Sequence, residues 1–138
     1  MFLGIDTSCY TTSVAVVNRQ GALIADNRQV LKVKAGQKGL RQSEAVFQHV
    51  QNLPLLLEQT AKTVELKQIR GVCVSSAPRN VEGSYMPVFT VGMAAAKTIA
   101  ISLGVPLFET SHQEGHIIAA GRSSGAPGAK QRVCIQLS

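Results

Sequence analysis

The chain has 138 residues, a formal net charge of +6 and 45% hydrophobic residues. This length fits one domain with a modest core, and the apolar fraction excludes a disordered or collagen-like chain. The longest uncharged stretch, residues 83–96, is too short and too weakly apolar to cross a membrane. The first ten residues carry no basic segment and the three cysteines form no CxxC pair. We therefore expect a cytoplasmic protein without membrane association and without a cysteine-based zinc site.

Positive charge is concentrated in one segment. Between Arg28 and Arg41 there are five cations and no acid. Clustered cations neutralise phosphates and release counterions, so this segment predicts contact with a nucleic acid. A solvated loop that happens to be basic fits the same composition.

The predicted elements begin with three strands, at residues 2–7, 11–17 and 22–30, separated by tight turns. A helical spacing of apolar residues follows, with Ser43 as the expected N-cap. Pro54 inside this run predicts a kink or a break into two helical pieces.

The second half of the chain alternates strands and helices. We expect a strand at 69–75, a helix at 89–103 that ends at Gly104, a strand at 105–109 and a helix at 112–120. An exposed loop at 121–129 and the start of a strand at 132–138 complete the chain. The order βββ-α-β-α-β-α-(β) predicts an α/β, ribonuclease-H-like domain with a mixed sheet, which binds ligands in loops beyond its strand ends.

Two histidines, His112 and His116, follow the strand at 105–109. On a helix, this spacing of four residues places both on one face, where they suit a shared metal ion. Glu114 lies about 200° around the helix from His112, so the HExxH zinc-protease mechanism does not apply. Ordinary hydrogen bonding near a helix N-terminus is the alternative. His49 lies on an apolar stripe and is more typical of a core histidine than of a further ligand.

The first hairpin is a weaker candidate site. Asp6 ends the first strand, and Thr7 and Ser8 follow it in a tight turn. A carboxylate suits Mg²⁺ and the donors of such a turn suit a phosphate, so these residues predict nucleotide binding. The chain has no P-loop, because Val91 and Ala96 stand where that motif needs glycine.

Two segments resemble a known family. GIDTSCYTTSVAVV is similar to the opening hairpin of the tRNA N6-threonylcarbamoyladenosine synthases, once misnamed O-sialoglycoprotein endopeptidases or glycoproteases. SSAPRNVEGSYMPVFTVGMAAAKTIAISLGVPLFETSHQEGH is similar to the next block of that family and ends in its HxEGH metal motif. The resemblance runs through essentially the whole chain, in order.

The resemblance implies a fold and a function. The fold is that of the actin, sugar kinase and Hsp70 superfamily, in which two ribonuclease-H-like lobes enclose a nucleotide cleft. The activity is transfer of a threonylcarbamoyl group to N6 of the tRNA adenosine beside the anticodon, and not proteolysis. By this resemblance His112 and His116 hold iron or zinc, ATP or magnesium binding needs the second lobe, and the partners are tRNA and the other proteins of the pathway.

The sequence also departs from the family pattern. Tyr10 and Thr11 replace an acidic pair, Asp6 replaces a glutamate, and residues 77–83 replace a glycine-rich stretch. We expect residues 1–138 to form a single N-terminal lobe of a divergent paralogue, inactive in isolation because the C-terminal lobe is absent. The alternative function is a non-catalytic paralogue that dimerises with the synthase or with itself.

Overall fold

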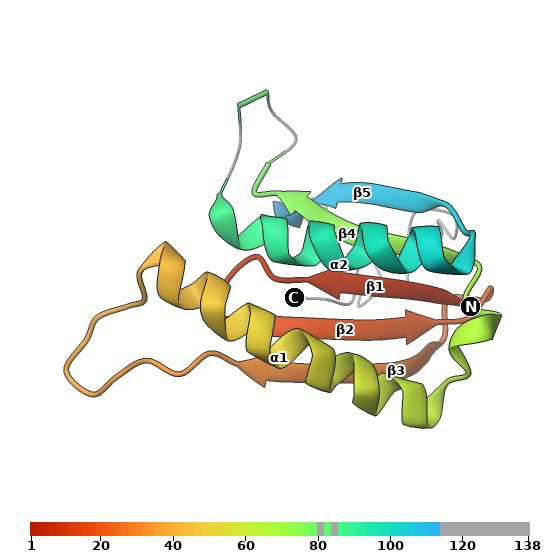
Figure 1. Ribbon diagram of the computed structural model, residues 1–138, viewed down its shortest axis with the longest axis horizontal. Coiled ribbons are helices and arrows are strands. Elements are labelled where there is room, and N and C mark those ends of the chain that lie inside the picture. Colours follow the sequence, from red (N-terminus) through yellow and green to blue (C-terminus); the bar gives the residue numbers. More distant parts are fainter. Residues whose placement is uncertain (80–81, 84–85, 114–138) are drawn as a thin grey trace.

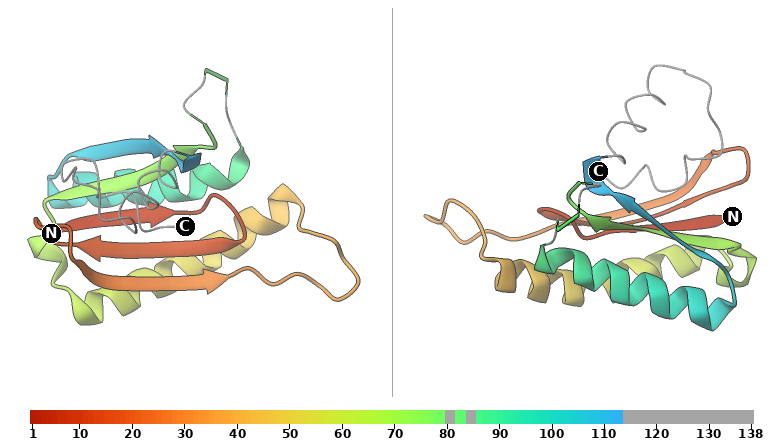
Figure 2. Two further views of the ribbon diagram at one scale, coloured as in Figure 1. Left: turned by 180° about the vertical axis from the view of Figure 1, so that it is seen from behind. Right: turned by 90° about the horizontal axis from the view of Figure 1, so that it is seen from above.

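The computed structural model describes residues 1–79, 82–83 and 86–113, which form one sheet covered by two helices. The strands are β1 (Phe2–Asp6), β2 (Thr11–Val17), β3 (Leu23–Val30), β4 (Gly71–Ala77) and β5 (Leu107–Ser111). The helices are α1 (Gln42–Thr63) and α2 (Pro87–Leu103), with a short 3₁₀ turn η1 (Leu66–Gln68) before β4. Both α-helices lie on the same face of the sheet, as the edge-on view in Figure 2 shows.

The sheet is mixed and has the strand order β3-β2-β1-β4-β5 (Figure 1). β1, β2 and β3 form an antiparallel meander, while β4 lies parallel to β1 and β5 lies parallel to β4. Parallel strands end at the same edge of a sheet, so the chain segments that leave β1, β4 and β5 meet there. The predicted succession of elements is confirmed from the first strand to β5.

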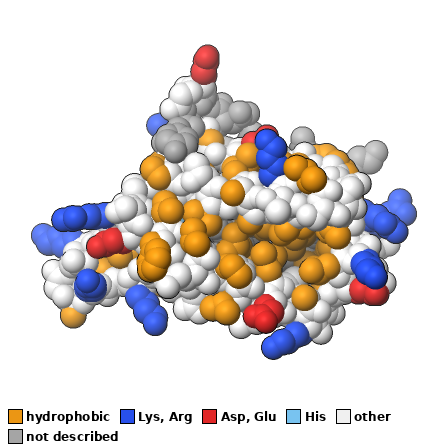
Figure 3. All heavy atoms as spheres, viewed as in Figure 1, with side chains coloured by type: hydrophobic (Ala, Val, Ile, Leu, Met, Phe, Trp, Pro, Cys, Tyr) orange, Lys and Arg blue, Asp and Glu red, His pale blue; other side chains and the backbone are white. Residues whose placement is uncertain are grey.

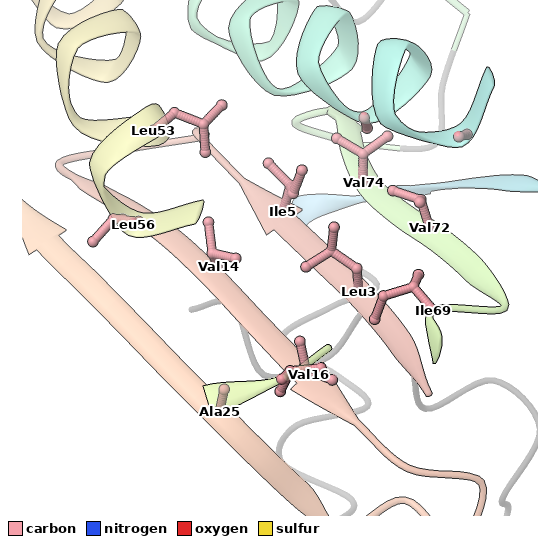
Figure 4. Packing of buried hydrophobic residues seen from close by; sticks show 13 residues of the cluster. Leu3, Ile5, Val14, Val16, Ala25, Leu53, Leu56, Ile69, Val72 and Val74 are labelled. Atoms are coloured by element: carbon pink, nitrogen blue, oxygen red, sulfur yellow. The ribbon is translucent and has the colours of Figure 1, made fainter. Parts of the chain in front are cut away.

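A large apolar cluster fills the space between the sheet and the helices (Figure 4), and a smaller one includes Val88 and Phe89 of α2. Alternate residues of β1 and β2, such as Leu3, Ile5 and Val14, point toward the helices and are fully buried. Leu53 and Leu56 of α1 pack onto them. Each such side chain contributes about 1.5–3 kcal/mol to stability. The edge of the sheet that carries Asp6 therefore continues directly from this buried core.

The start of α1 differs from the prediction. The N-cap is Arg41, two residues before the predicted Ser43, and the Glu44 side chain accepts a hydrogen bond of 3.3 Å from the Arg41 N–H. Pro54 does not divide the helix. Its ring lies on the exposed side, where water can satisfy the carbonyl that loses its partner, while Leu53 and Leu56 keep the buried side packed.

The second half of the fold follows the prediction with small shifts. α2 ends at Gly104, whose φ of 66° is the left-handed conformation that favours glycine at a helix end. β5 begins two residues later than expected, so its end lies directly before His112. The helix predicted at 112–120, the loop at 121–129 and the strand at 132–138 lie outside the described residues beyond position 113. Among the helices that the structure does describe, none has the length and hydropathy needed to cross a membrane.

Candidate functional site

The candidate site lies where β1, β4 and β5 end. β1 contributes Asp6 and the turn that follows it, β4 contributes Ser75, and His112 stands directly after β5. The β4–β5 register shifts between Ser75 and Ala77, which is typical of strand irregularities beside functional sites. The Gln113 N–H donates to the Pro78 carbonyl at 3.2 Å, so the segment after β5 is tied to the loop after β4.

Asp6 is the centre of this arrangement, and its side chain is almost completely buried. Its Oδ1 accepts a hydrogen bond of 2.7 Å from the Ser8 N–H. Its Oδ2 accepts a hydrogen bond of 3.0 Å from the Ser75 hydroxyl and lies 3.2 Å from Nδ1 of His112. A buried carboxylate is stable only when it is paired or hydrogen-bonded, and three polar groups supply that here.

The His112 side chain is 19% exposed and approaches the turn with both ring nitrogens. Nδ1 lies 2.8 Å from the Ser8 hydroxyl in addition to its contact with Asp6. Nε2, on the opposite side of the ring, lies 4.0 Å from Sγ of Cys9, and Cys9 is exposed. The Nδ1 side of the imidazole therefore faces a buried carboxylate, while the Nε2 side lies near the exposed Cys9.

The metal site predicted at His112 and His116 is described only in part. His116 lies outside the described residues, and no group of three or more His, Cys, Asp or Glu side chains within residues 1–79, 82–83 and 86–113 is arranged to hold a metal ion. His112 itself fits such a role, because an imidazole whose Nδ1 is bonded to a carboxylate offers Nε2 to a metal. The metal site stays a prediction.

Thr7 links β1 to α2. It is fully buried, and its hydroxyl donates to the Val88 carbonyl at 2.7 Å and accepts from the Gly92 N–H at 3.1 Å. A Cβ at Gly92 would lie 3.0 Å from the Thr7 hydroxyl, so glycine at this position permits the close approach of helix and strand. Nucleotide binding by Asp6, Thr7 and Ser8 stays a prediction, since each of these residues has polar contacts within the fold.

His49 has the structural role that the sequence indicated. It is fully buried, Nε2 lies 3.0 Å from the Cys9 carbonyl oxygen, and Nδ1 lies 2.8 Å from the Thr12 hydroxyl. Because the carbonyl only accepts, Nε2 carries the proton and Nδ1 accepts from Thr12. Burial lowers the pKa of His49, against opposing contributions from the Cys9 carbonyl and the Asp6 charge. His49 is thus a neutral core histidine that holds the turn after β1.

The basic segment forms the end of β3 and the loop that leads to α1. The Arg28 guanidinium donates hydrogen bonds of 2.9 Å and 3.2 Å to the two carboxylate oxygens of Asp26. Asp26 is an acid that lies just outside the predicted basic segment. Lys32 is held through its backbone, which makes hydrogen bonds of 2.8 Å and 2.9 Å with the Gln48 side chain. Lysine and arginine side chains gather at the end of the molecule where this loop projects (Figure 3).

Tyr10 joins this loop to the hairpin. Its carbonyl accepts a hydrogen bond of 2.7 Å from the Leu31 N–H, and its hydroxyl lies 3.0 Å from the position that a Cβ on Gly39 would take. Tyr10, one of the two residues that replace the family's acidic pair, thus packs against the basic loop. The candidate site and the basic loop share one end of the molecule.

Sequence reasoning missed two contributors to the site. The sequence places Ser75 at the start of a strand-to-helix loop that could approach a ligand, and Cys9 in the first hairpin, but it connects neither residue with His112. Both lie near His112 because β4 and β5 run parallel to β1. One signal could have indicated Ser75: it is a hydroxyl residue near the end of β4, the strand that pairs with the strand of Asp6.

The fold and the site define a class of protein. A mixed sheet in the order 3-2-1-4-5, with an antiparallel meander followed by parallel strands, is a ribonuclease-H-like lobe. A sequence profile of the family described as tRNA N6-adenosine threonylcarbamoyltransferase matches residues 23–132. The chain belongs to this family.

Individual relatives agree with this assignment. Proteins named tRNA N6-adenosine threonylcarbamoyltransferase from Thermotoga neapolitana and Desulfitobacterium hafniense are 34% and 35% identical to the chain over 119 and 121 residues. Each match covers 85% of this chain, but only 35% of the first relative and 34% of the second. The chain thus spans about a third of the length of these relatives.

Solved structures support the fold. YeaZ from Pseudomonas aeruginosa matches with a TM-score of 0.63 and 18% identity, over 90% of this chain and 49% of that chain. A second structure, described as similar to peptidase YEAZ from the same organism, matches with a TM-score of 0.64 and 17% identity over the same shares. At this identity the likeness concerns the fold alone.

Proposed function

We propose that this chain is the metal-binding lobe of a threonylcarbamoyl transferase that acts on the tRNA adenosine beside the anticodon. The observation that carries the proposal is His112, the first histidine of the HxEGH motif, which lies directly after β5 with its Nδ1 against a buried carboxylate. The family to which the chain belongs and the names of its relatives support the same function.

In this proposal His112 and His116 hold iron or zinc, which supplies a positive charge that binds and orients the threonylcarbamoyl group. Imidazole nitrogens suit both metals. The chain's own residues have defined tasks: Asp6 and Ser8 orient the His112 ring, and Thr7 fixes the turn to α2. Any ATP or magnesium would bind with a second lobe, as residues 1–138 correspond to one lobe.

Because residues 1–138 correspond to a third of each relative, we propose that the chain binds the threonylcarbamoyl donor without transferring it. The test uses radiolabelled threonylcarbamoyl adenylate with the zinc-loaded chain and tRNA. We expect retention of label on the protein, loss of that retention in His112→Ala, and no labelled tRNA. Equal retention by wild type and His112→Ala would contradict the proposal, and labelled tRNA would refute inactivity in isolation.

We also propose that the basic loop contacts tRNA. Lys34 and Lys38 are exposed, and the loop projects from the end of the molecule that carries the site. Replacing both lysines by glutamine should weaken tRNA binding at low salt and lower the salt slope by about 1–2, since each phosphate contact contributes about 0.7–0.9. Replacing Lys62 and Lys67, exposed lysines of other segments, provides the matched control. Unchanged binding would identify the loop as merely solvated.

A second candidate function is that of a non-catalytic paralogue that forms a dimer. The observation in its favour is the outer face of α1, where Phe47, Val50 and Leu55 are 62%, 52% and 57% exposed. Apolar side chains are visible over this helical face in Figure 3. Exposed apolar patches of this kind are typical of interaction sites. A stable homodimer without bound metal, disrupted by Phe47→Asp, would favour this function over the first; a metal-loaded monomer would exclude it.

A further inference from the structure

The turn after β1 was predicted to present the Asp6 carboxylate to Mg²⁺ or a nucleotide, but the carboxylate is directed into the protein. Its side chain is 4% exposed. Both oxygens face polar groups of the fold: the Ser8 N–H at 2.7 Å, the Ser75 hydroxyl at 3.0 Å and the His112 ring at 3.2 Å. Such a group is better placed to orient a neighbour than to meet a ligand from solvent.

The contact with His112 fixes the position of one proton. An ionised carboxylate has no hydrogen to donate, so a hydrogen bond between Asp6 and a neutral His112 requires the proton on Nδ1. The Ser8 hydroxyl, 2.8 Å from the same nitrogen, can accept from that N–H as well. The lone pair of the imidazole is then on Nε2, which lies 4.0 Å from Sγ of the exposed Cys9.

The carboxylate is itself held in place. Ser75 reaches it from β4 and the Ser8 N–H from the turn, so Asp6 cannot rotate away without losing two hydrogen bonds. Metal-binding histidines commonly donate their second N–H to a carboxylate, which sets the tautomer, fixes the ring and raises the basicity of the ligand nitrogen. The arrangement around His112 is of this type.

We propose that Asp6 is a positioning residue that selects the Nδ1–H tautomer of His112 and turns Nε2 toward the metal. This inference rests on the proposed function for its metal, which would be zinc or ferrous iron. It assigns Asp6 a task in place of direct magnesium or nucleotide binding. The aspartate that replaces the family's glutamate is short enough to bond Ser8, Ser75 and His112 together.

The experiment combines two measurements on the 138-residue chain. Zinc affinity is measured by competition with a chromophoric chelator, and the His112 tautomer is read from imidazole ¹⁵N chemical shifts of the metal-free protein. In Asp6→Asn we expect a 10- to 100-fold weaker zinc affinity, as for other residues that support a metal ligand. We also expect a shift of His112 toward the Nε2–H tautomer. Asp26→Asn, the same change at an exposed aspartate of β3, should alter neither reading.

The outcomes separate this inference from the proposed function. An unchanged tautomer in a folded Asp6→Asn protein overturns the inference, even if zinc affinity falls. If wild type binds no zinc but the tautomer still depends on Asp6, the metal role in the proposed function fails while the orienting role of Asp6 stands. Should Asp6→Asn not fold, Ser8→Ala removes the other partner of Nδ1 and keeps the Asp6 carboxylate, so the Nδ1–H tautomer must persist in it; a shift to Nε2–H would overturn the inference.

Discussion

Two histidines flank the turn after β1, and their surroundings give them different roles. His49, from α1, is fully buried, and its ring contacts the Cys9 carbonyl and the Thr12 hydroxyl. His112, after β5, is 19% exposed, and only its Nδ1 side faces a buried anion. The comparison shows that residue type alone does not set the role of a histidine, because the burial of the two rings and the partners of their nitrogens differ.

The largest effect on stability is expected at His49. Replacing it by alanine removes the partner of the Cys9 carbonyl and the acceptor of the Thr12 hydroxyl, which keeps only its hydrogen bond of 3.2 Å from Asn52; each unsatisfied buried group costs about 1–3 kcal/mol. We expect His49→Ala to lower the free energy of unfolding by about 2–4 kcal/mol in urea denaturation. A change below about 0.5 kcal/mol would contradict the structural role of His49.

The contribution of His49 to the free energy of unfolding also depends on pH. Since burial lowers the pKa of His49 in the folded state, the unfolded chain binds a proton more readily below the ordinary value of 6.5. The His49 contribution to stability is therefore complete above pH 6.5 and declines as the pH falls toward the folded pKa, by up to about 1.4 kcal/mol per pH unit. Unfolding measured from pH 8 to 5 should show this decline.

The control for this experiment is His49→Gln, whose side chain does not titrate in this range. The decline between pH 6.5 and 5 should be smaller in His49→Gln than in wild type. An identical decline in the two proteins would assign the pH dependence to other groups.

The smallest effect on stability is expected at His112. His112→Ala removes a partly exposed ring, and the Asp6 carboxylate keeps its hydrogen bonds from the Ser8 N–H and the Ser75 hydroxyl. We expect the free energy of unfolding to change by less than about 1 kcal/mol, a fraction of the effect at His49. If His112→Ala destabilises the protein as strongly as His49→Ala, the two histidines are both structural and the comparison fails.

The sequence predicted the local features of this molecule better than its long-range contacts. The bounds of β2, the end of α2 at Gly104 and the core position of His49 follow from apolar periodicity and glycine chemistry. The start of α1 was mispredicted, and of the two outcomes predicted at Pro54 the break into two helical pieces does not occur, because packing along the buried side outweighs local helix signals.

The candidate site was predicted as two separate features, the turn at Asp6 and the histidine pair. Asp6 and His112 are separated by 106 positions, and only the parallel pairing of β1, β4 and β5 brings them within 3.2 Å. No periodicity in the sequence reports such a contact. The bonds from Ser75 to Asp6 and from His49 to the Cys9 carbonyl have the same origin.

The central claim is that His112, unlike His49, is a metal ligand. Its most direct test is the metal content of purified wild type, His112→Ala, His116→Ala and His49→Gln, measured by elemental analysis after loading with zinc and removal of excess. The account predicts about one zinc per chain in wild type and His49→Gln, and a near-complete loss in both alanine variants. Equal metal in wild type and the two alanine variants would contradict it.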